Sequence, residues 1–364
     1  MFSAQDYTHM ARAIQLAEKP IFSPHPNPRV GCVIFKDGFI LGEGFHAFAG
    51  GPHAEVNALN SLSGSAEGAT AYVTLEPCCY HGKTPPCVEA LIAAKVKRVV
   101  VAMLDPNPKV SGKGISLLHE AGIEVESGLL QEQAEKLNVG FIKRMKFSKP
   151  WVRTKIAMSF DGRTAMLSGE SQWITGPDAR QNVQLLRARA DAILTGSGTV
   201  LVDNPKMTVR GIEDSNGKAR QPLRVIVDSE RKLDRGLEIF QQTGQCLLAV
   251  LSSSSKDNFS SNVTVKCYSE KAGHVDLNEL LDDLASREIN EVHVEAGSRL
   301  NGALLSSGLI DEIVVYVAPT IMGSEAKGLF DLPGLSEMKD RVQLSIVDTR
   351  IVGRDICFKL RPEY

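Results

Sequence analysis

The chain has 364 residues, of which 43% are hydrophobic and 23% are charged, and its formal net charge is −2 at pH 7. This composition is typical of a soluble globular protein, the length favours two domains, and the charge argues against nucleic-acid or membrane partners. No apolar run is long enough to span a bilayer, and the N-terminus lacks a secretion signal. We therefore interpret the seven cysteines as thiols and metal ligands of a cytoplasmic protein.

The first half of the chain alternates helical and strand patterns. Residues 4–18 have helical spacing, and residues 30–35 and 39–44 predict a hairpin with an Asp37-Gly38 turn. Further strands are predicted over 69–75 and 96–104, helices opening near residues 53 and 87, and another strand–helix unit over 114–125. This alternation predicts a sheet sandwiched between helices.

The most specific motif combines Pro52-His53-Ala54-Glu55 with a cysteine-rich segment over residues 77–87. An imidazole, two thiols and a carboxylate are the groups of a catalytic zinc site, in which three protein ligands leave one position for a water of lowered pKa. Residues at i and i+2 of a helix do not share a face, so we expect His53 to be a ligand and Glu55 a proton carrier. This set is the signature of zinc deaminases.

The cysteine spacing departs from that signature. Eight residues separate Cys78 from Cys87 where the short pattern has two, so Cys79 and His81 are alternative ligands. We favour Cys78 and Cys87, because each follows a proline and Cys87 opens a predicted helix whose N-terminus would stabilise a thiolate. A closed structural zinc site and a group of buried cysteines are the alternatives.

The pattern restarts near residue 147, and we expect domains over 1–146 and 147–364. A strand is predicted over 151–158, a surface loop over 252–262, and two strands lead into glycine-containing loops, Gly196–Thr199 and Gly297–Ala303. Backbone N–H groups of such loops can approach a phosphate, although neither loop is a dinucleotide fingerprint. Together with Arg187, Arg210 and Arg299 they favour a phosphate-bearing ligand over ordinary turns.

These segments together resemble the bifunctional riboflavin-biosynthesis proteins, in which a pyrimidine deaminase is fused to a pyrimidine-ribose reductase. The resemblance covers nearly the whole chain. In the first half it is carried by Asn27–Gly31, Gly50–Glu55, Thr74–Cys78 and Gly82–Cys87. In the second half it is carried by Lys155–Gly162, Gln172–Thr175, Thr195–Thr199, Asp203–Pro205 and Val294–Gly297.

The resemblance implies a cytidine-deaminase-like three-layer αβα domain followed by a dihydrofolate-reductase-like α/β domain. It implies two reactions: zinc-hydroxide hydrolysis removes a ring amine from a diamino-hydroxypyrimidine that carries a ribosylamino phosphate, and NADPH then reduces the ribosyl group to a ribityl chain. The cofactors implied are Zn²⁺ and NADPH. Family members associate through their reductase domains, so we expect a homo-oligomer.

The resemblance also implies site residues. Zinc would be held by His53, Cys78 and Cys87, with Glu55 as the catalytic proton carrier, and the deaminase substrate by Asn27, His46, Lys83 and Asn107. NADPH would be contacted by Ala157, Trp173, Thr199, Asp203, Ser229, Gly297, Ser298, Arg299, Leu300, Asn301, Gly302 and Ala303. The second substrate would be contacted by Lys155, Ser171, Arg187, Met207, Arg210 and Glu295. Lys155 and Asp203 are the candidate proton donors of the reductase.

Plainer interpretations compete for several of these residues. Asn27 suits a turn, His46 and Lys83 could be solvated, the arginines could form exposed salt bridges, and Trp173 could be a core aromatic. Two other functions also compete for the whole chain. One is a deaminase of another nucleobase or of tRNA, and the other is a structural zinc clip joined to an NADPH-binding sensor.

Overall fold

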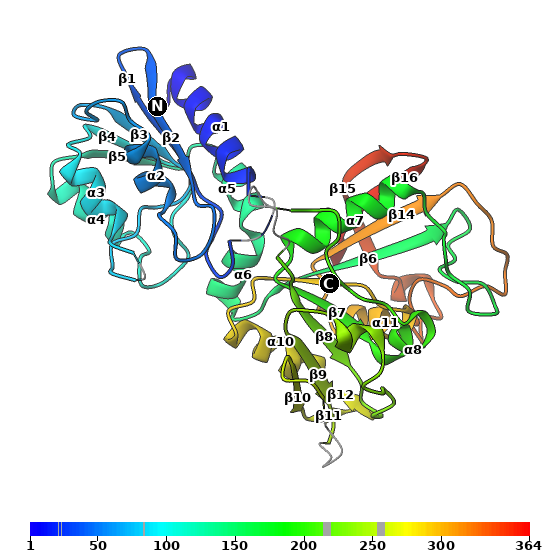
Figure 1. Cartoon of the computed structure of the whole chain (residues 1–364). Coiled ribbons are helices and arrows are strands. Elements are labelled where there is room, and N and C mark those ends of the chain that lie inside the picture. The colour runs from blue at the N-terminus through cyan, green and yellow to red at the C-terminus, as the bar shows by residue number, and fades with distance from the viewer. Residues whose placement is uncertain (21, 23, 83, 214–219, 253–258) are drawn as a thin grey trace. The chain divides into compact units, whose positions relative to one another are not determined.

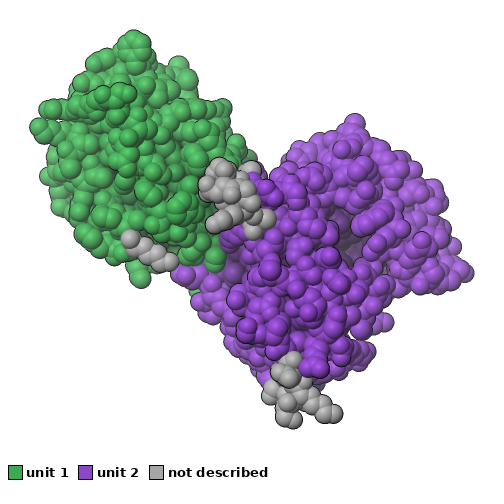
Figure 2. Space-filling view, viewed as in Figure 1, with its two compact units in different colours: residues 1–148 green, residues 149–364 purple. Residues whose placement is uncertain are grey.

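The computed structural model describes residues 1–20, 22, 24–82, 84–213, 220–252 and 259–364. They form two compact units, Met1–Ser148 and Lys149–Tyr364 (Figures 1 and 2). Each unit is an α/β structure, which confirms the predicted fold class. Lys83 and most of the loop predicted over 252–262 lie outside the described residues. Within the described ranges, no helix combines the length and the apolar character needed to cross a bilayer.

The first unit is built on a sheet with strand order β2-β1-β3-β4-β5. Its strands are β1 (Gly31–Lys36), β2 (Phe39–Phe45), β3 (Thr70–Val73), β4 (Arg98–Val101) and β5 (Glu124–Ser127). Its helices are α1 (Ala4–Glu18), α2 (Ala54–Asn60), α3 (Cys87–Ala93), α4 (Lys113–Glu120), α5 (Gln131–Leu137) and α6 (Val139–Phe147). Strand β1 pairs antiparallel with β2 and β3, whereas β3, β4 and β5 run parallel.

The predicted hairpin and first helix are confirmed. Asp37 and Gly38 both have positive φ, 51° and 88°, which is the backbone geometry that a tight hairpin turn requires. Helix α1 begins where Ser3 and Asp6 form a reciprocal capping box.

Two glycines show that helices cover both faces of this sheet. A Cβ on Gly31 of β1 would lie 2.0 Å from the Ala13 carbonyl oxygen of α1. A Cβ on Gly44 of β2 would lie 2.3 Å from the Ala58 backbone nitrogen of α2. Because Gly31 pairs with Phe45 and Gly44 pairs with Cys32, the two helices lie on opposite faces. The unit is therefore the predicted three-layer sandwich, with α2 held close against the sheet.

The second unit is built on a long sheet with strand order β10-β9-β8-β7-β13-β6-β14-β16-β15 (Figure 1). Its strands are β6 (Trp151–Ser159), β7 (Ala192–Gly196), β8 (Leu223–Val227), β9 (Cys246–Val250), β10 (Val263–Cys267), β13 (Glu291–Val294), β14 (Glu312–Ala318), β15 (Gln343–Val352) and β16 (Asp355–Glu363). A small ribbon is formed by β11 (Glu270–Lys271) and β12 (His274–Val275). The helices are α7 (Pro177–Arg189), α8 (Ser197–Asp203), α9 (Glu238–Gln241), α10 (Leu277–Ser286) and α11 (Ser298–Ser306), with a short 3₁₀ turn at Met338–Asp340.

The neighbouring strands of this sheet from β10 to β14 pair in parallel, and β16 runs antiparallel to both of its neighbours, β14 and β15. The carboxyl ends of the parallel strands therefore meet at one edge of the sheet, where open α/β sheets place their ligands. Strands β7, β13 and β6 are neighbours in the middle of this sheet.

The glycine loops are shorter than predicted. Helix α8 already begins at Ser197, and α11 begins at Ser298, so that Arg299–Ala303 is helical and not part of a loop. Asn301, Leu304 and Leu305 are buried at helical spacing, and this amphipathic pattern explains why the helix begins directly after Gly297.

Candidate active sites

The first unit brings together the three side chains favoured as metal ligands. His53 is the N-cap residue of α2, Cys78 follows β3, and Cys87 is the first residue of α3. The His53 Nδ1 atom lies 3.2 Å from Cys87 Sγ and 3.5 Å from Cys78 Sγ, and all three ligand atoms lie within 4.8 Å of one another. The alternative ligand Cys79 instead has its Sγ 3.9 Å from the Lys109 carbonyl oxygen.

The spacing of these atoms fits a tetrahedral zinc ion. Zinc bonds of about 2.0 Å to nitrogen and about 2.3 Å to sulfur place tetrahedral N and S ligands about 3.5 Å apart. The second ring nitrogen of His53, Nε2, lies 3.4 Å from Thr84 Oγ1. Such a hydrogen bond fixes the ring so that Nδ1 is left free to bind a metal. Thr84 belongs to the segment Gly82–Cys87, but the spacing of that segment does not predict the contact between Thr84 and His53.

The thiol of Cys78 is prepared to ionise. Hydrogen bonds from Cys87 and His53 outweigh burial and lower the pKa of Cys78 to about 4. The backbone N–H of Cys87, at the start of α3, donates to Cys78 Sγ over 3.3 Å. A thiolate is the form in which cysteine binds metal.

Glu55 is only 3% exposed and lies in the first turn of α2. Burial raises the pKa of this carboxyl group to about 7, and the neighbouring Cys78 charge adds to the effect. A buried carboxyl group beside a metal site can both accept and return a proton near neutral pH. His53 and Glu55 therefore both lie at the start of α2, but His53 belongs to the ligand cluster whereas Glu55 is a buried carboxyl group outside it.

Two candidate substrate contacts of the first unit are linked to each other. The Asn27 side-chain amide lies 3.0 Å from His46 Nε2, and His46 Nδ1 donates to the Pro52 carbonyl oxygen over 3.1 Å. His46 is 2% exposed, which excludes a solvated ring, and burial lowers its pKa. Its ring lies edge-on to that of His53 at 5.2 Å. Asn27 and His46 therefore stand beside the ligand cluster.

Asn107 lies in the loop that follows β4. Its backbone N–H donates to Asp105 Oδ1 over 2.8 Å, and its side-chain oxygen accepts from the Lys109 N–H over 3.1 Å. The side chain also hydrogen-bonds Tyr80, two residues beyond Cys78. This contact places the loop after β4 next to the segment that carries Cys78.

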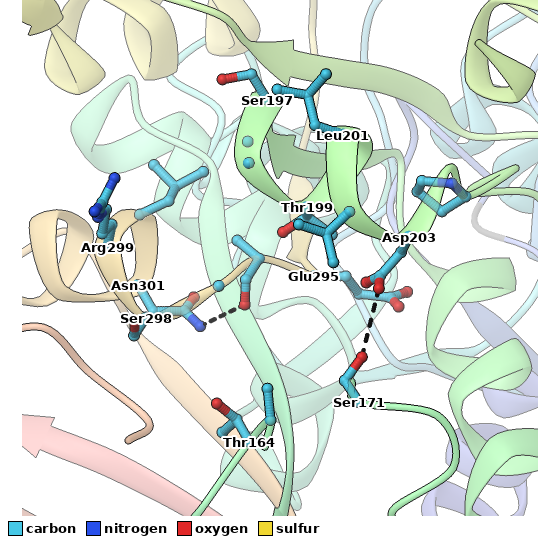
Figure 3. A pocket seen from close by; sticks show the side chains of 18 of the residues that line it. Thr164, Ser171, Ser197, Thr199, Leu201, Asp203, Glu295, Ser298, Arg299 and Asn301 are labelled. Atoms are coloured by element: carbon cyan, nitrogen blue, oxygen red, sulfur yellow. Dashed lines mark hydrogen bonds between the residues drawn. The ribbon is translucent and has the colours of Figure 1, made fainter. Parts of the chain in front are cut away.

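The second unit contains a cavity of about 1120 Å³ at the carboxyl ends of its central strands. It is lined by every predicted reductase contact except Gly302, namely Lys155, Ala157, Ser171, Trp173, Arg187, Thr199, Asp203, Met207, Arg210, Ser229, Glu295, Gly297, Ser298, Arg299, Leu300, Asn301 and Ala303. Gly302 instead faces the backbone of Asp331, whose carbonyl oxygen a Cβ would approach to 2.0 Å. Figure 3 shows Ser298, Arg299 and Asn301 on one side of the cavity and Ser171 and Asp203 on the other.

Arg187 and Glu295 form a buried pair in the cavity wall. Arg187 Nε and Nη2 donate to the two oxygens of Glu295 over 2.5 and 2.9 Å, and Nη1 donates to the Thr208 carbonyl oxygen over 2.8 Å. An exposed salt bridge is therefore the wrong interpretation of Arg187. Because its donors are bound within the protein, Arg187 orients Glu295, whereas Arg210 is exposed at the cavity.

The two candidate proton donors also line this cavity. Burial lowers the pKa of Lys155 on β6, and the charge of Glu295 opposes that shift. Burial raises the pKa of Asp203, whose Oδ1 accepts from Ser171 Oγ over 3.4 Å (Figure 3). The lowered pKa makes the Lys155 ammonium a stronger acid, and the raised pKa keeps more of the Asp203 carboxyl group protonated, so each shift suits a proton donor.

Trp173 is 66% exposed, so it is not a core aromatic. The guanidinium of Arg180 lies 4.8 Å from the centre of its ring, a cation–π contact that holds the indole at the cavity. Arg180 and Lys327 line the same cavity and were not singled out from the sequence, because neither belongs to a recognisable motif.

Comparisons with known proteins match both units. Residues 3–103 match the cytidine and deoxycytidylate deaminase zinc-binding region, and residues 150–358 match the RibD C-terminal domain. The chain is 50% identical to the riboflavin biosynthesis protein RibD of Escherichia coli K12, over 98% of this chain and 99% of that protein. It is 45% identical to the RibD protein of Haemophilus influenzae, over 100% of this chain and 99% of that protein.

Solved structures give the same result. The chain superposes on Acinetobacter baumannii RibD, form 1, with a TM-score of 0.92 and 44% identity, covering 99% of each chain. It superposes on a diaminohydroxyphosphoribosylaminopyrimidine deaminase/5-amino-6-(5-phosphoribosylamino)uracil reductase of Thermotoga maritima with a TM-score of 0.86 and 35% identity, covering 98% of this chain and 99% of that one. On the strength of both domain matches and this full-length similarity, the chain belongs to the RibD family of riboflavin biosynthesis proteins.

Proposed function

We propose that this chain catalyses two consecutive steps of riboflavin biosynthesis. The domain over residues 1–146 hydrolyses the ring amine of the diamino-hydroxypyrimidine ribosylamino phosphate. The domain over residues 147–364 then reduces the ribosyl group of the product to a ribityl chain with NADPH. One observation carries this proposal: a His–Cys–Cys cluster with a buried glutamate in one unit, and a large cavity lined by reductase-type residues in the other.

In the deaminase step, His53 Nδ1 and the sulfurs of Cys78 and Cys87 would hold a zinc ion. When bound, the metal would supply Lewis acidity that lowers the pKa of a water molecule towards about 7. Glu55 accepts a proton from the attacking water on its carboxylate and donates it to the leaving amine, a positioned transfer that contributes about 10²–10⁴-fold. Asn27, His46, Lys83 and Asn107 orient the pyrimidine and its phosphate.

In the reductase step, NADPH supplies the hydride and the protein supplies position and charge. The N–H groups at the start of α11, with Ser298 and Arg299 beside them, suit a phosphate of the cofactor. Arg210 suits the substrate phosphate, because a guanidinium binds phosphate through two parallel hydrogen bonds. Lys155, which lines the cavity, is the first candidate to give a proton to the ring oxygen of the ribose as the ring opens, and Asp203 is the second.

A coupled assay tests this function. Purified protein receives the diamino-hydroxypyrimidine ribosylamino phosphate and NADPH, while ammonia release and NADPH absorbance are followed together. We expect ammonia to appear first, NADPH oxidation to follow, and a zinc chelator to stop both. Turnover of free cytidine, guanine or tRNA would instead favour the other deaminase function, and ammonia release without NADPH oxidation would refute the reductase step.

We also propose a cytoplasmic enzyme that associates through its reductase domain. Strand β15 is an edge strand of ten residues, with Ile346, Val347 and Ile351 exposed. Such an edge invites pairing with another copy of the chain. None of the seven cysteines, all of which lie among the described residues, forms a disulfide, which suits a reducing compartment. Replacing Ile346 and Ile351 with lysine should shift the mass measured by light scattering towards that of one chain, and an unchanged mass would refute this interface.

A further inference from the structure

Glu76 is a buried carboxylate to which the roles above give no function. It follows β3, is 3% exposed, and stands two residues before Cys78. Its backbone N–H donates to the Met103 carbonyl oxygen, just after β4, over 3.0 Å. The side chain is therefore fixed between the ends of two neighbouring strands, next to the segment that carries a metal ligand.

The carboxylate of Glu76 accepts hydrogen bonds from four backbone N–H groups. Oε2 accepts from Asp105 over 3.2 Å and from Gly112 over 2.9 Å. Oε1 accepts from Gly114 over 3.0 Å and from Ile115 over 3.4 Å. Gly112 is the N-cap residue of α4 and has no side chain of its own for capping, so Glu76 satisfies that helix start from a distant part of the chain.

The bonds from Asp105 and Gly112 hold the loop over residues 105–112 at both ends, and the bonds from Gly114 and Ile115 hold the first turn of α4. The loop carries Asn107, whose N–H is held by Asp105, the same residue that donates to Glu76. A Cβ on Gly114 would lie 2.2 Å from the Pro77 carbonyl oxygen, so α4 packs directly against the segment leading to Cys78. Charge-assisted bonds to backbone N–H groups are stronger than neutral ones, and here they fix a loop that lacks regular structure.

We propose that Glu76 is a positioning residue of the deaminase site, which holds the loop over residues 105–112 so that Asn107 meets the pyrimidine substrate. Glu76 acts on substrate binding and not on the metal or on proton transfer. This inference rests on the proposed deaminase function.

The substitution Glu76→Gln tests this role, because it keeps the size of the side chain but replaces one acceptor oxygen with an NH₂ group that faces two N–H donors. We expect the KM for the diamino-hydroxypyrimidine substrate to rise about 10-fold or more, because buried donors are left unsatisfied. The kcat should change by less than about threefold, since Glu55 and the metal ligands keep their places. Bound zinc, measured by atomic absorption, should stay at the parent level.

Glu120→Gln is the matched control, because Glu120 is exposed at the last position of the same helix, α4. Its KM and kcat should equal those of the parent. Calorimetric unfolding of the first unit reports the folding of each variant, and NADPH oxidation with the deaminated intermediate reports that the second unit is unaffected. If the parent itself releases no ammonia, the proposed function fails before this inference is reached.

A double-mutant cycle with Asn107→Ala decides whether Glu76 acts through that residue. We expect the double variant to have a KM no higher than the larger single effect, because both changes remove the same contact. Three results would each overturn the proposal: a KM of the double variant that shows the product of the two single increases, an unchanged KM in Glu76→Gln, or loss of bound zinc together with a fall in kcat. If Glu76→Gln shows no calorimetric unfolding transition of the first unit and so has not folded, Gly114→Ala, which displaces α4 from Pro77, takes its place in the cycle with the same expected and overturning results.

Discussion

Glu55 is the residue on which the deaminase mechanism depends most. It lies next to the ligand cluster without belonging to it, and Glu55→Gln preserves its shape while removing its ability to carry a proton. Ammonia release should therefore fall by about 10²–10⁴-fold. Bound zinc and NADPH oxidation with the deaminated intermediate should be unchanged. Deamination near the parent rate would show that Glu55 is not the proton carrier and would favour a structural zinc site.

The buried pair of Arg187 and Glu295 gives a second prediction at this scale. Arg187→Met leaves the Glu295 carboxylate buried without its partner, so the second unit should lose about 3 kcal/mol of unfolding free energy. Both tryptophans, Trp151 and Trp173, lie in this unit, so their fluorescence in a urea titration reports its unfolding. Arg189→Met removes an exposed arginine from the same helix and should change the unfolding free energy by less than about 0.5 kcal/mol. Equal effects of the two substitutions would contradict this account.

The metal ligands His53, Cys78 and Cys87 could be predicted from the sequence, because they lie in short motifs with recognisable spacing. The sequence did not reveal that Arg187 is bound to Glu295, since the two lie 108 positions apart, on α7 and just after β13, and only the tertiary fold brings them together. Nor did it reveal the contacts of Glu76, whose four donors come from the loop after β4 and from the first turn of α4.

Helix α2 packs so closely against strand β2 that the position of the metal ligand His53 depends on Gly44, which has no side chain. Gly44→Ala would place a Cβ 2.3 Å from the Ala58 backbone nitrogen and push α2, with His53, away from the sheet. We expect a loss of about 1–3 kcal/mol in unfolding free energy and reduced zinc content. Calorimetry and zinc analysis measure the two effects. Gly64→Ala meets no atom within 4 Å and should change neither; a stable, fully zinc-loaded Gly44→Ala protein would contradict the expectation.

Elements with local signals were predicted well, and those defined by tertiary packing were not. The hairpin at Asp37-Gly38 and helix α1 follow from turn and capping chemistry that neighbouring residues supply. The start of α11 was missed, because a Gly-Ser-Arg segment resembles a phosphate loop until the burial of Asn301 and Leu304 is known. Strands β3 and β4 are shorter than the apolar runs that predicted them, because the residues after each strand no longer pair with a neighbouring strand. They lead instead into the loops that carry Cys78 and Asn107.

At the scale of the whole molecule, His9 makes the stability of the first unit depend on pH. His9 is buried against the rings of Phe35 and Tyr72, and burial lowers its pKa below 6.5, while the Asp6 charge opposes the shift. The folded unit then binds fewer protons than the unfolded chain just below pH 6.5. This contribution is complete above that pH and is lost as the pH falls through the folded pKa. Burial opposes ionisation of Asp6, but hydrogen bonds from Arg98 and Ser3 hold its pKa far below its usual range, so Asp6 titrates at lower pH.

We therefore expect the parent protein to lose unfolding free energy relative to His9→Phe as the pH falls below 6.5, whereas the raised pKa of Glu55, which acts in the opposite direction, is common to both proteins. His9→Phe keeps a ring between Phe35 and Tyr72 but cannot take up a proton, so this part of the pH dependence should disappear. Calorimetric scans of both proteins across this range provide the measurement. Parallel pH profiles would show that His9 does not carry the effect.

The central claim is that two separate sites act in sequence on one substrate. The most direct test gives zinc-stripped protein either the diamino-hydroxypyrimidine substrate or its deaminated product, each with NADPH. Two separate sites require that the stripped protein leave the first compound unchanged, oxidise NADPH with the second, and recover ammonia release when zinc is restored. Loss of both activities from stripped protein that remains folded, or NADPH oxidation with the first compound before any ammonia appears, would contradict the claim.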